Sequence, residues 1–220
     1  MEQNEQNQGL FLSFEGIDGS GKSTQAKLLF EKLTQNNIPS LYTKEPTDLP
    51  IGQMIRNLFS KKESQIEKHA QIFLFMADRV QHCQEILLPA LKAKKIVICD
   101  RYFDSTLAYQ GLDLPLQQWI QKISPPFLPK PALTFFLDCP PEVAFQRLTD
   151  RNAKTKQAKS YFEERGVKFL QDVQAAYLKI YQQEKKRILR IPANQNPTSI
   201  EQKIWSHLLQ KHPQFFLQSA

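Results

Sequence analysis

Apolar residues along the chain gather in five short runs, separated by longer segments in which apolar residues recur at helical spacing. The short runs carry almost no polar alternation, which is typical of strands covered on both faces of a sheet. These runs predict strands at Leu10–Phe14, Ser40–Thr43, Ile96–Cys99, Leu133–Leu137 and Ile188–Ile191.

The longer segments predict helices. In one of them Ala26, Leu29 and Leu33 are three or four residues apart, which places them on one helix face. Such patterns indicate helices at Lys22–Gln35, Gln65–Leu91, Pro141–Arg151, Phe162–Lys185 and Ser199–Gln210. Because strands alternate with helices, we expect the α/β class, with a three-layer, doubly wound arrangement around a five-stranded parallel sheet.

Two segments interrupt this alternation. Leu112–Pro131 is rich in proline and predicts loops around a short helix at Gln117–Ile123. Asp150–Ser160 is polar and basic with almost nothing to bury, and it predicts a mobile excursion. A length of 220 residues suits one domain over 1–220, preceded by a polar tail at 1–9.

Composition narrows the class of protein. A net charge of +7 suits an anionic partner, either a nucleotide or a nucleic acid, and it equally suits a basic solvated surface with no such partner; charge alone does not choose among these. Cys83, Cys99 and Cys139 form no C-x-x-C pair, so no disulfide framework or zinc site is indicated. The chain has neither an apolar run of about 20 residues nor a signal-peptide pattern. We therefore expect a cytoplasmic protein with no membrane partner.

Residues Gly16–Ser23 match the P-loop pattern G-x-x-x-x-G-K-[ST] between a predicted strand and a predicted helix. In such a loop the backbone N–H groups and the helix N-terminus surround phosphate oxygens. Lys22 is expected to reach the β- and γ-phosphates of ATP, and the Ser23 hydroxyl is expected to ligate Mg²⁺. The expected ATP-binding residues are Gly16, Ile17, Asp18, Gly19, Ser20, Gly21, Lys22, Ser23 and Thr24.

Asp100 ends a predicted strand at the edge of the sheet where open α/β proteins bind ligands. A carboxylate at this position suits a Mg²⁺ site. An aspartate that caps a turn is the alternative.

The run D-R-Y-x-x-S-x-x-A-Y-Q-G at 100–111 resembles the thymidylate kinases. The resemblance extends from Leu10 to Leu209 and implies the reaction ATP + dTMP → ADP + dTDP, with Mg²⁺ and a homodimer. Further motifs follow in the family's order at Phe14–Asp18, Lys44–Thr47, Ile51–Arg56, Leu74–Arg79 and Leu137–Glu142.

The residues present suit this chemistry. The acceptor is a phosphate whose second pKa is about 6, so it is already a nucleophile at neutral pH and needs no general base. The enzyme has only to position two polyanions and neutralise charge as the phosphoryl group moves. Lys22, Arg101, Asp100 and a cation from the basic segment are the expected catalytic groups.

The resemblance also implies how the acceptor is held. Arg101 is expected to grip the dTMP phosphate in a bidentate manner, with Arg56 as a weaker clamp. Asp18 is expected to approach the 3′-hydroxyl. Glu45 belongs to the same acceptor site, although it lies in Glu45-Pro46-Thr47-Asp48, where bacterial relatives commonly have E-P-G-G.

The remaining acceptor residues are expected at the base and sugar. Phe75 is expected to stack on thymine, and Arg79 to donate to a base carbonyl, which favours thymine or uracil over cytosine. Tyr109 is expected to lie under the sugar and exclude a 2′-hydroxyl. Alternatively, Phe75 and Tyr109 are core aromatics and Arg79 is solvated. Candidates for the base edge are Ser105, Thr106 and Gln110.

The basic segment corresponds to the family's lid over ATP, at about 147–162. Some thymidylate kinases carry an arginine in the P-loop where this chain has Gly19, whereas the bacterial-type members without it take the cation from the lid. The resemblance therefore implies that Arg151 is catalytic and that Arg147 lies nearer the adenine. As a plain charge run, the segment is a solvated loop.

Two other functions compete with this interpretation. The first is another nucleotide or deoxynucleoside kinase on the same fold. The second is a nucleic-acid-binding protein or a P-loop switch, which the basic pI of about 9.2 favours. Because the cationic residues cluster at the predicted nucleotide site and lid, and the sequence has no RNA-binding aromatic signature, we expect no nucleic-acid partner. The resemblance implies ATP and dTMP as the partners.

Overall fold

The computed structural model describes residues 9–60, 66–155 and 161–216. Its centre is one sheet of five parallel strands in the order β2-β3-β1-β4-β5. The expected α/β class and five-stranded parallel sheet are confirmed. The strands are β1 (Leu10–Glu15), β2 (Ser40–Lys44), β3 (Ile96–Asp100), β4 (Leu133–Asp138) and β5 (Ile188–Pro192).

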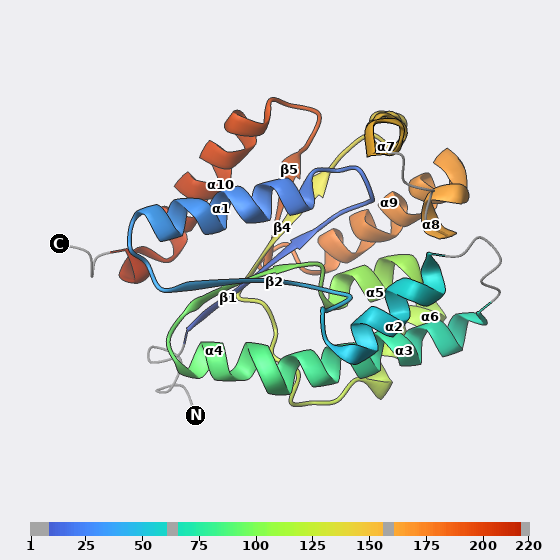
Figure 1. Cartoon of the computed structure of the whole chain (residues 1–220), viewed down its shortest axis with the longest axis horizontal. Helices are drawn as coiled ribbons and strands as arrows, with labels where there is room; N and C mark the ends of the chain where they lie inside the picture. The colour runs from blue at the N-terminus through green and yellow to red at the C-terminus, as the bar shows by residue number, and fades with distance from the viewer. Residues whose placement is uncertain (1–8, 61–65, 156–160, 217–220) are drawn as a thin grey trace.

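Helices cover both faces of the sheet. On one face α1 (Lys22–Gln35) and α10 (Pro197–Lys211) lie side by side, and the other face carries α4 (Leu88–Lys92) and α9 (Gly166–Gln183) (Figure 1). No helix in the described ranges is long and apolar enough to cross a membrane. The other α-helices are α2 (Pro50–Phe59), α3 (Lys68–His82), α5 (Phe103–Tyr109), α6 (Leu114–Ile123), α7 (Pro141–Thr155) and α8 (Tyr161–Glu164).

The core forms where the strands' unbroken apolar runs meet the apolar faces of the helices. Leu12, Phe14 and Phe135 are fully buried in the sheet, and Leu33 of α1 packs in the same cluster. Polar residues within the strands find partners, since the Ser13 and Thr134 hydroxyls are 2.7 Å apart across β1 and β4.

The helix predicted at Gln65–Leu91 is found as one uninterrupted helical segment from Lys68 to Lys92, although one turn within it is π-helical. The structure has α3, a π-helical turn at Cys83–Leu87 and then α4, while Gln65 lies outside the described residues. The N–H of Leu88 donates to the carbonyl of Cys83, five residues back. Pro89 follows at once, and because proline has no N–H it cannot continue the α-helical ladder unaided.

Several other helices also differ from prediction. Helices α2 and α5 were not predicted, and the helix predicted at Phe162–Lys185 divides into α8 and α9 at Gly166, which has a φ of +72°. Helix α7 continues to Thr155, so Asp150–Thr155 is helical and the expected excursion is wrong there; Asn152 is buried and donates to Glu163. Residues 156–160 lie outside the description, as do 1–8 of the predicted tail.

The parallel strands place the chemically active residues at one edge of the sheet. The P-loop follows β1 directly, and Arg101 follows β3, with the Arg101 N–H donating to Phe14 O at 3.0 Å. Helices α2, α3, α5 and α8 gather at the same end, at the right in Figure 1. This edge is where doubly wound sheets bind ligands.

We predict that Phe135→Ala lowers the free energy of unfolding by about 3–5 kcal/mol, because the lost ring leaves a cavity in a core that cannot collapse around it. The matched control is Phe127→Ala, since that side chain is 46% exposed whereas Phe135 is fully buried. Urea unfolding followed by circular dichroism measures both. Equal effects of the two substitutions would contradict this account of the core.

Candidate active site

The P-loop curls through three glycines with positive φ, Gly16, Gly19 and Gly21. Lys22 is buried, and its Nζ donates to the carbonyl of Ile17 at 2.8 Å. Burial and then the charge of Arg101 lower the pKa of Lys22 to about 8. The Ser20 hydroxyl is buried and has no partner among the described residues. The loop therefore holds polar groups that an anion would satisfy.

A cavity of about 520 Å³, here called the P-loop cavity, opens over this loop. Of the residues predicted to bind ATP, only Gly16 and Ile17 do not line it, since Ile17 is buried beneath the loop. The predicted ATP-binding residues that line it are Asp18, Gly19, Ser20, Gly21, Lys22, Ser23, Thr24 and Arg147.

Gly19 is required by its surroundings. Its φ is +80°, and a Cβ at this position would collide with the backbone carbonyl of Ala144 in α7. The loop of this chain therefore cannot present an arginine from position 19 without moving α7. Any guanidinium over the phosphates has to come from another element.

Helix α7 supplies two such groups. Arg147 and Arg151 are one turn apart and both line the P-loop cavity. Arg147 donates to Ala193 O at 3.0 Å. Arg151 pairs with Glu163, yet its side chain remains 52% exposed. Arg151 is thus held at the cavity with part of its guanidinium accessible.

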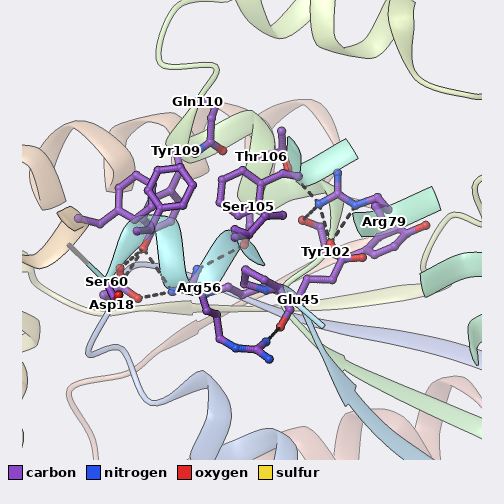
Figure 2. Close-up of a pocket in the computed structure, with 16 residues that line it drawn as sticks. Asp18, Glu45, Arg56, Ser60, Arg79, Tyr102, Ser105, Thr106, Tyr109 and Gln110 are labelled. Carbon is purple, nitrogen blue, oxygen red and sulfur yellow. Dashed lines mark hydrogen bonds and ion pairs between the residues drawn. The ribbon is translucent and has the colours of Figure 1, made fainter. Parts of the chain in front are cut away.

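A second cavity, of about 540 Å³, lies beside the first and is here called the acceptor cavity (Figure 2). It is walled by the loop after β2 and by α2, α3, α5 and α8. All ten residues predicted to bind the acceptor line it, which are Asp18, Glu45, Arg56, Phe75, Arg79, Arg101, Ser105, Thr106, Tyr109 and Gln110.

Asp18 and Arg101 line both cavities. Arg101 forms an ion pair with Asp18, and the Tyr109 hydroxyl donates to the other oxygen of that carboxylate at 3.0 Å. Burial alone would raise the pKa of Asp18, but the charges of Arg101 and Lys22 outweigh it and lower the pKa. An ionised Asp18 therefore ties the P-loop to the acceptor cavity.

Arg79 is buried at the opposite side of the acceptor cavity, at the right in Figure 2. Its Nε and Nη2 donate to Glu45 Oε2 at 3.0 and 2.7 Å, and Nη2 also donates to Tyr102 O and Thr106 Oγ1. The other Glu45 oxygen contacts His82 Nδ1 at 3.0 Å. Arg79 Nη1 alone has no partner among the described residues. The alternative of a solvated Arg79 is wrong, because this side chain is buried.

Three other residues predicted to bind the acceptor already form hydrogen bonds to protein groups. Arg56 donates to Pro46 O at 2.7 Å and pairs with Asp48, so its guanidinium is held by the loop after β2. Glu45 has both oxygens occupied. Thr106 Oγ1 already accepts from Arg79.

Ser105 lines the cavity, but its hydroxyl donates inward to Glu15 at 2.6 Å. The expectation that Ser105 reads a base edge therefore does not suit this geometry.

Aromatic rings line one side of the acceptor cavity. Phe75 is half-buried and stacks on Phe59 of α2 with ring centroids 5.5 Å apart. Phe59 in turn stacks on Phe162 of α8 at 5.2 Å. Sequence reasoning missed Phe59 and Phe162 as cavity residues. A helical pattern at Ile51, Ile55 and Phe59 was the available signal for α2.

Asp100 lies at the end of β3 with its Oδ1 buried and without a partner among the described residues. Its Oδ2 accepts a long hydrogen bond of 3.5 Å from Tyr42. The described residues contain no group of three His, Cys, Asp or Glu side chains arranged to hold a metal. Such a sparse set suits Mg²⁺, which is commonly held by one or two protein oxygens together with water and substrate phosphates.

Comparison with known proteins agrees with this geometry. The thymidylate kinase family model matches residues 14–204. The thymidylate kinase of Solidesulfovibrio magneticus is 37% identical over 89% of this chain and 97% of the relative. That of Aster yellows witches'-broom phytoplasma is 38% identical over 94% of this chain and 98% of the relative. A crystal structure of thymidylate kinase from Ehrlichia chaffeensis superimposes with a TM-score of 0.70 at 28% identity, covering 91% of this chain and 98% of that one. The resemblance drawn from the motifs is confirmed, and the chain belongs to the thymidylate kinase family.

Proposed function

We propose that this chain transfers the γ-phosphoryl group of ATP to dTMP and releases ADP and dTDP. The observation that carries the proposal is the pair of cavities that share Asp18 and Arg101. One cavity lies over the P-loop, which is built for a triphosphate. The other is apolar on one side and carries arginines on the other. A phosphoryl group passing between two nucleotides has to cross where the cavities meet.

Positioning and charge supply the catalysis. The dTMP phosphate is the nucleophile, and Arg101 holds its oxygens beside the P-loop. Lys22 contacts the β- and γ-phosphates, and Arg151 neutralises the charge that spreads over the transferring group. Closure of the lid, at about 147–162 within the domain of 1–220, keeps water from accepting the phosphoryl group.

The Mg²⁺ that accompanies ATP would be held by Ser23 and Asp100. The unpartnered, buried Asp100 Oδ1 supports this assignment. When bound, the ion would neutralise part of the charge on the phosphate oxygens. The Asp100 carbonyl accepts from the Glu45 N–H at 3.0 Å, which ties the end of β3 to the loop after β2.

The base is read by Arg79 and stacked by Phe75. The free Arg79 Nη1 donates to the C4 carbonyl of thymine, while Glu45 orients the guanidinium from behind. A cytosine amino group would place two donors against each other, which a buried site rejects strongly. Gln110 and Thr106 complete this wall.

The sugar lies over Tyr109, with Asp18 near its 3′-hydroxyl. Tyr109 packs edge-on against Phe162 and Phe169, so its ring is not free to withdraw and make room for a 2′-hydroxyl. This packing supports selection of deoxyribose.

The protein also associates as a homodimer, which we propose from its exposed apolar side chains. Phe73 of α3 and Leu114 of α6 are 56% and 53% exposed. Phe73 packs on Trp119 of α6 at 5.7 Å, so the two helices present one apolar surface. Burial of this surface against a second copy removes it from water.

An acceptor panel tests the proposed reaction. Coupled measurement of ADP release with dTMP, dUMP, dCMP, UMP and thymidine should give the highest kcat/KM with dTMP. The value for dCMP should be lower by about 100-fold or more, because its amino group opposes Arg79 Nη1. Faster turnover with thymidine than with dTMP would instead indicate a nucleoside kinase.

A second experiment tests the lid arginine. Arg151→Ala should lower kcat by roughly 10³-fold, because the planar guanidinium stabilises charge only in the transition state. Lys154→Ala is the matched control, since Lys154 is an exposed cation on the same helix and outside the P-loop cavity. The control should stay within about threefold of the wild type. A loss below about threefold in Arg151→Ala would remove this residue from the mechanism.

A further inference from the structure

Glu15 is a buried carboxylate that no step of the mechanism uses. It is the last residue of β1, is only 1% exposed and lines neither cavity. Burying a carboxylate destabilises the folded state unless several hydrogen-bond donors contact its oxygens. Its place beneath the junction of the two cavities indicates a role in holding that junction.

Three donors from three segments converge on this carboxylate. The N–H of Tyr102 donates to Oε1 at 2.8 Å. The hydroxyls of Ser105 and Tyr177 donate to Oε2 at 2.6 and 2.9 Å. Tyr102 lies in the turn after β3, Ser105 in α5 and Tyr177 in α9. Glu15 therefore joins the P-loop strand to the elements that surround Arg101.

Arg101 needs this support. Its φ is +73°, in a left-handed region that residues with a side chain rarely adopt. Its neighbour Tyr102 is held by Glu15, and its Nη1 donates to Ser105 Oγ at 3.4 Å. When Glu15 is ionised, the Ser105 hydrogen points to the carboxylate and the oxygen's lone pairs face Arg101. A chain of hydrogen bonds thus runs from Arg101 through Ser105 to Glu15.

We propose that Glu15 is a positioning residue that fixes Arg101 for the acceptor phosphate, acting through Ser105 and through the backbone of Tyr102. This inference rests on the proposed role of Arg101 as the phosphate clamp. The donating hydroxyl of Tyr177, whose ring stacks on Phe136 at 5.3 Å, anchors the carboxylate from α9. Glu15 touches neither substrate and acts by orienting the group that does.

The surroundings of Glu15 make its charge depend on pH near neutrality. Burial, then the nearby charge of Asp104, raises the pKa of Glu15 to about 7, while the Ser105 hydrogen bond and the charge of Arg101 lower it. Lys22 and Arg79 also face it with positive charge. Because the pKa is raised, the carboxylate becomes protonated as the pH falls through about 7, and one of its hydrogen bonds then reverses direction.

The test compares Glu15→Gln with the wild type in steady-state kinetics with dTMP and ATP varied separately. The KM for dTMP should rise about tenfold or more, the loss expected for a hydrogen bond that orients a charged group. The KM for ATP should stay within about threefold. Glu201→Gln is the matched control, since Glu201 pairs with Lys32 away from both cavities.

Arg101→Ala separates this inference from the proposed function. If Arg101→Ala leaves the KM for dTMP unchanged, the proposed clamp is wrong. If Arg101→Ala raises it and Glu15→Gln does not, only the positioning role is wrong. Combining Glu15→Gln with Ser105→Ala should cost less than the two single losses multiplied together, because both act in one chain.

One measurement and one replacement variant guard against a general loss of structure. A melting curve with and without ATP shows whether Glu15→Gln still folds and binds nucleotide. If Glu15→Gln does not fold, Tyr177→Phe replaces it, since this variant keeps the carboxylate and removes one donor; it should raise the KM for dTMP by a smaller factor. No change in that KM for Tyr177→Phe would then overturn the inference.

The ratio of wild-type to Glu15→Gln kcat/KM for dTMP should fall as the pH drops from about 8 to about 6, because kcat/KM reports ionisation in the free enzyme. The ionisation of dTMP itself, with a second pKa of about 6, cancels in this ratio. A ratio that is constant with pH would contradict a role for the ionised carboxylate.

Discussion

The ion pair between Asp18 and Arg101 is the interaction on which the rest of the site depends. It joins the loop after β1 to the turn after β3, two neighbouring strands of the sheet. Both residues line the P-loop cavity and the acceptor cavity. Because parallel strands end at one edge, the chain brings residues 83 positions apart into contact without a long loop. The fold thereby places the two cavities next to each other.

That arrangement concentrates charge in a small buried volume, and each charge needs a partner. Burial and then repulsion from Arg101 lower the pKa of Lys22, and the charges of Asp18, Asp100 and Glu15 partly offset this. Incoming phosphates would add negative charge beside the cations. The site is therefore strained electrostatically before substrates arrive and is better balanced when they are bound, which favours binding of polyanions over neutral ligands.

The elements that could be predicted from sequence are those marked by a pattern within a few neighbouring residues. Short, largely apolar runs located all five strands, and glycine spacing located the P-loop. Helix α5 was missed because seven residues carry too little periodicity, whereas α2 had Pro50 at its first position and was available from its pattern. The π-helical turn before Pro89 is a local change of hydrogen-bond register, five residues back instead of four, which apolar spacing does not record.

Within the site, the family motifs identified residues that line the acceptor cavity, but they did not show which polar groups are free. Glu45, Ser105 and Arg56 lie at the cavity with their polar atoms bonded to protein, while Arg79 keeps one donor. The bond between Glu15 and Tyr177 spans 162 residues, a separation at which spacing carries no information. Which side chains contact substrate and which hold the contacting ones in place is a property of packing in three dimensions.

The close approach of Gly19 to Ala144 shows that packing in three dimensions also decides which cations reach the P-loop cavity. A side chain at position 19 would collide with α7, because the backbone of Gly19 lies directly against the backbone carbonyl of Ala144. The same helix carries Arg147 and Arg151 toward the P-loop cavity. The missing side chain in the loop is thus what allows α7 to come close enough to deliver a guanidinium from above. In this chain the glycine at position 19 and the placement of Arg147 and Arg151 at the P-loop cavity both follow from the close packing of α7 on the loop.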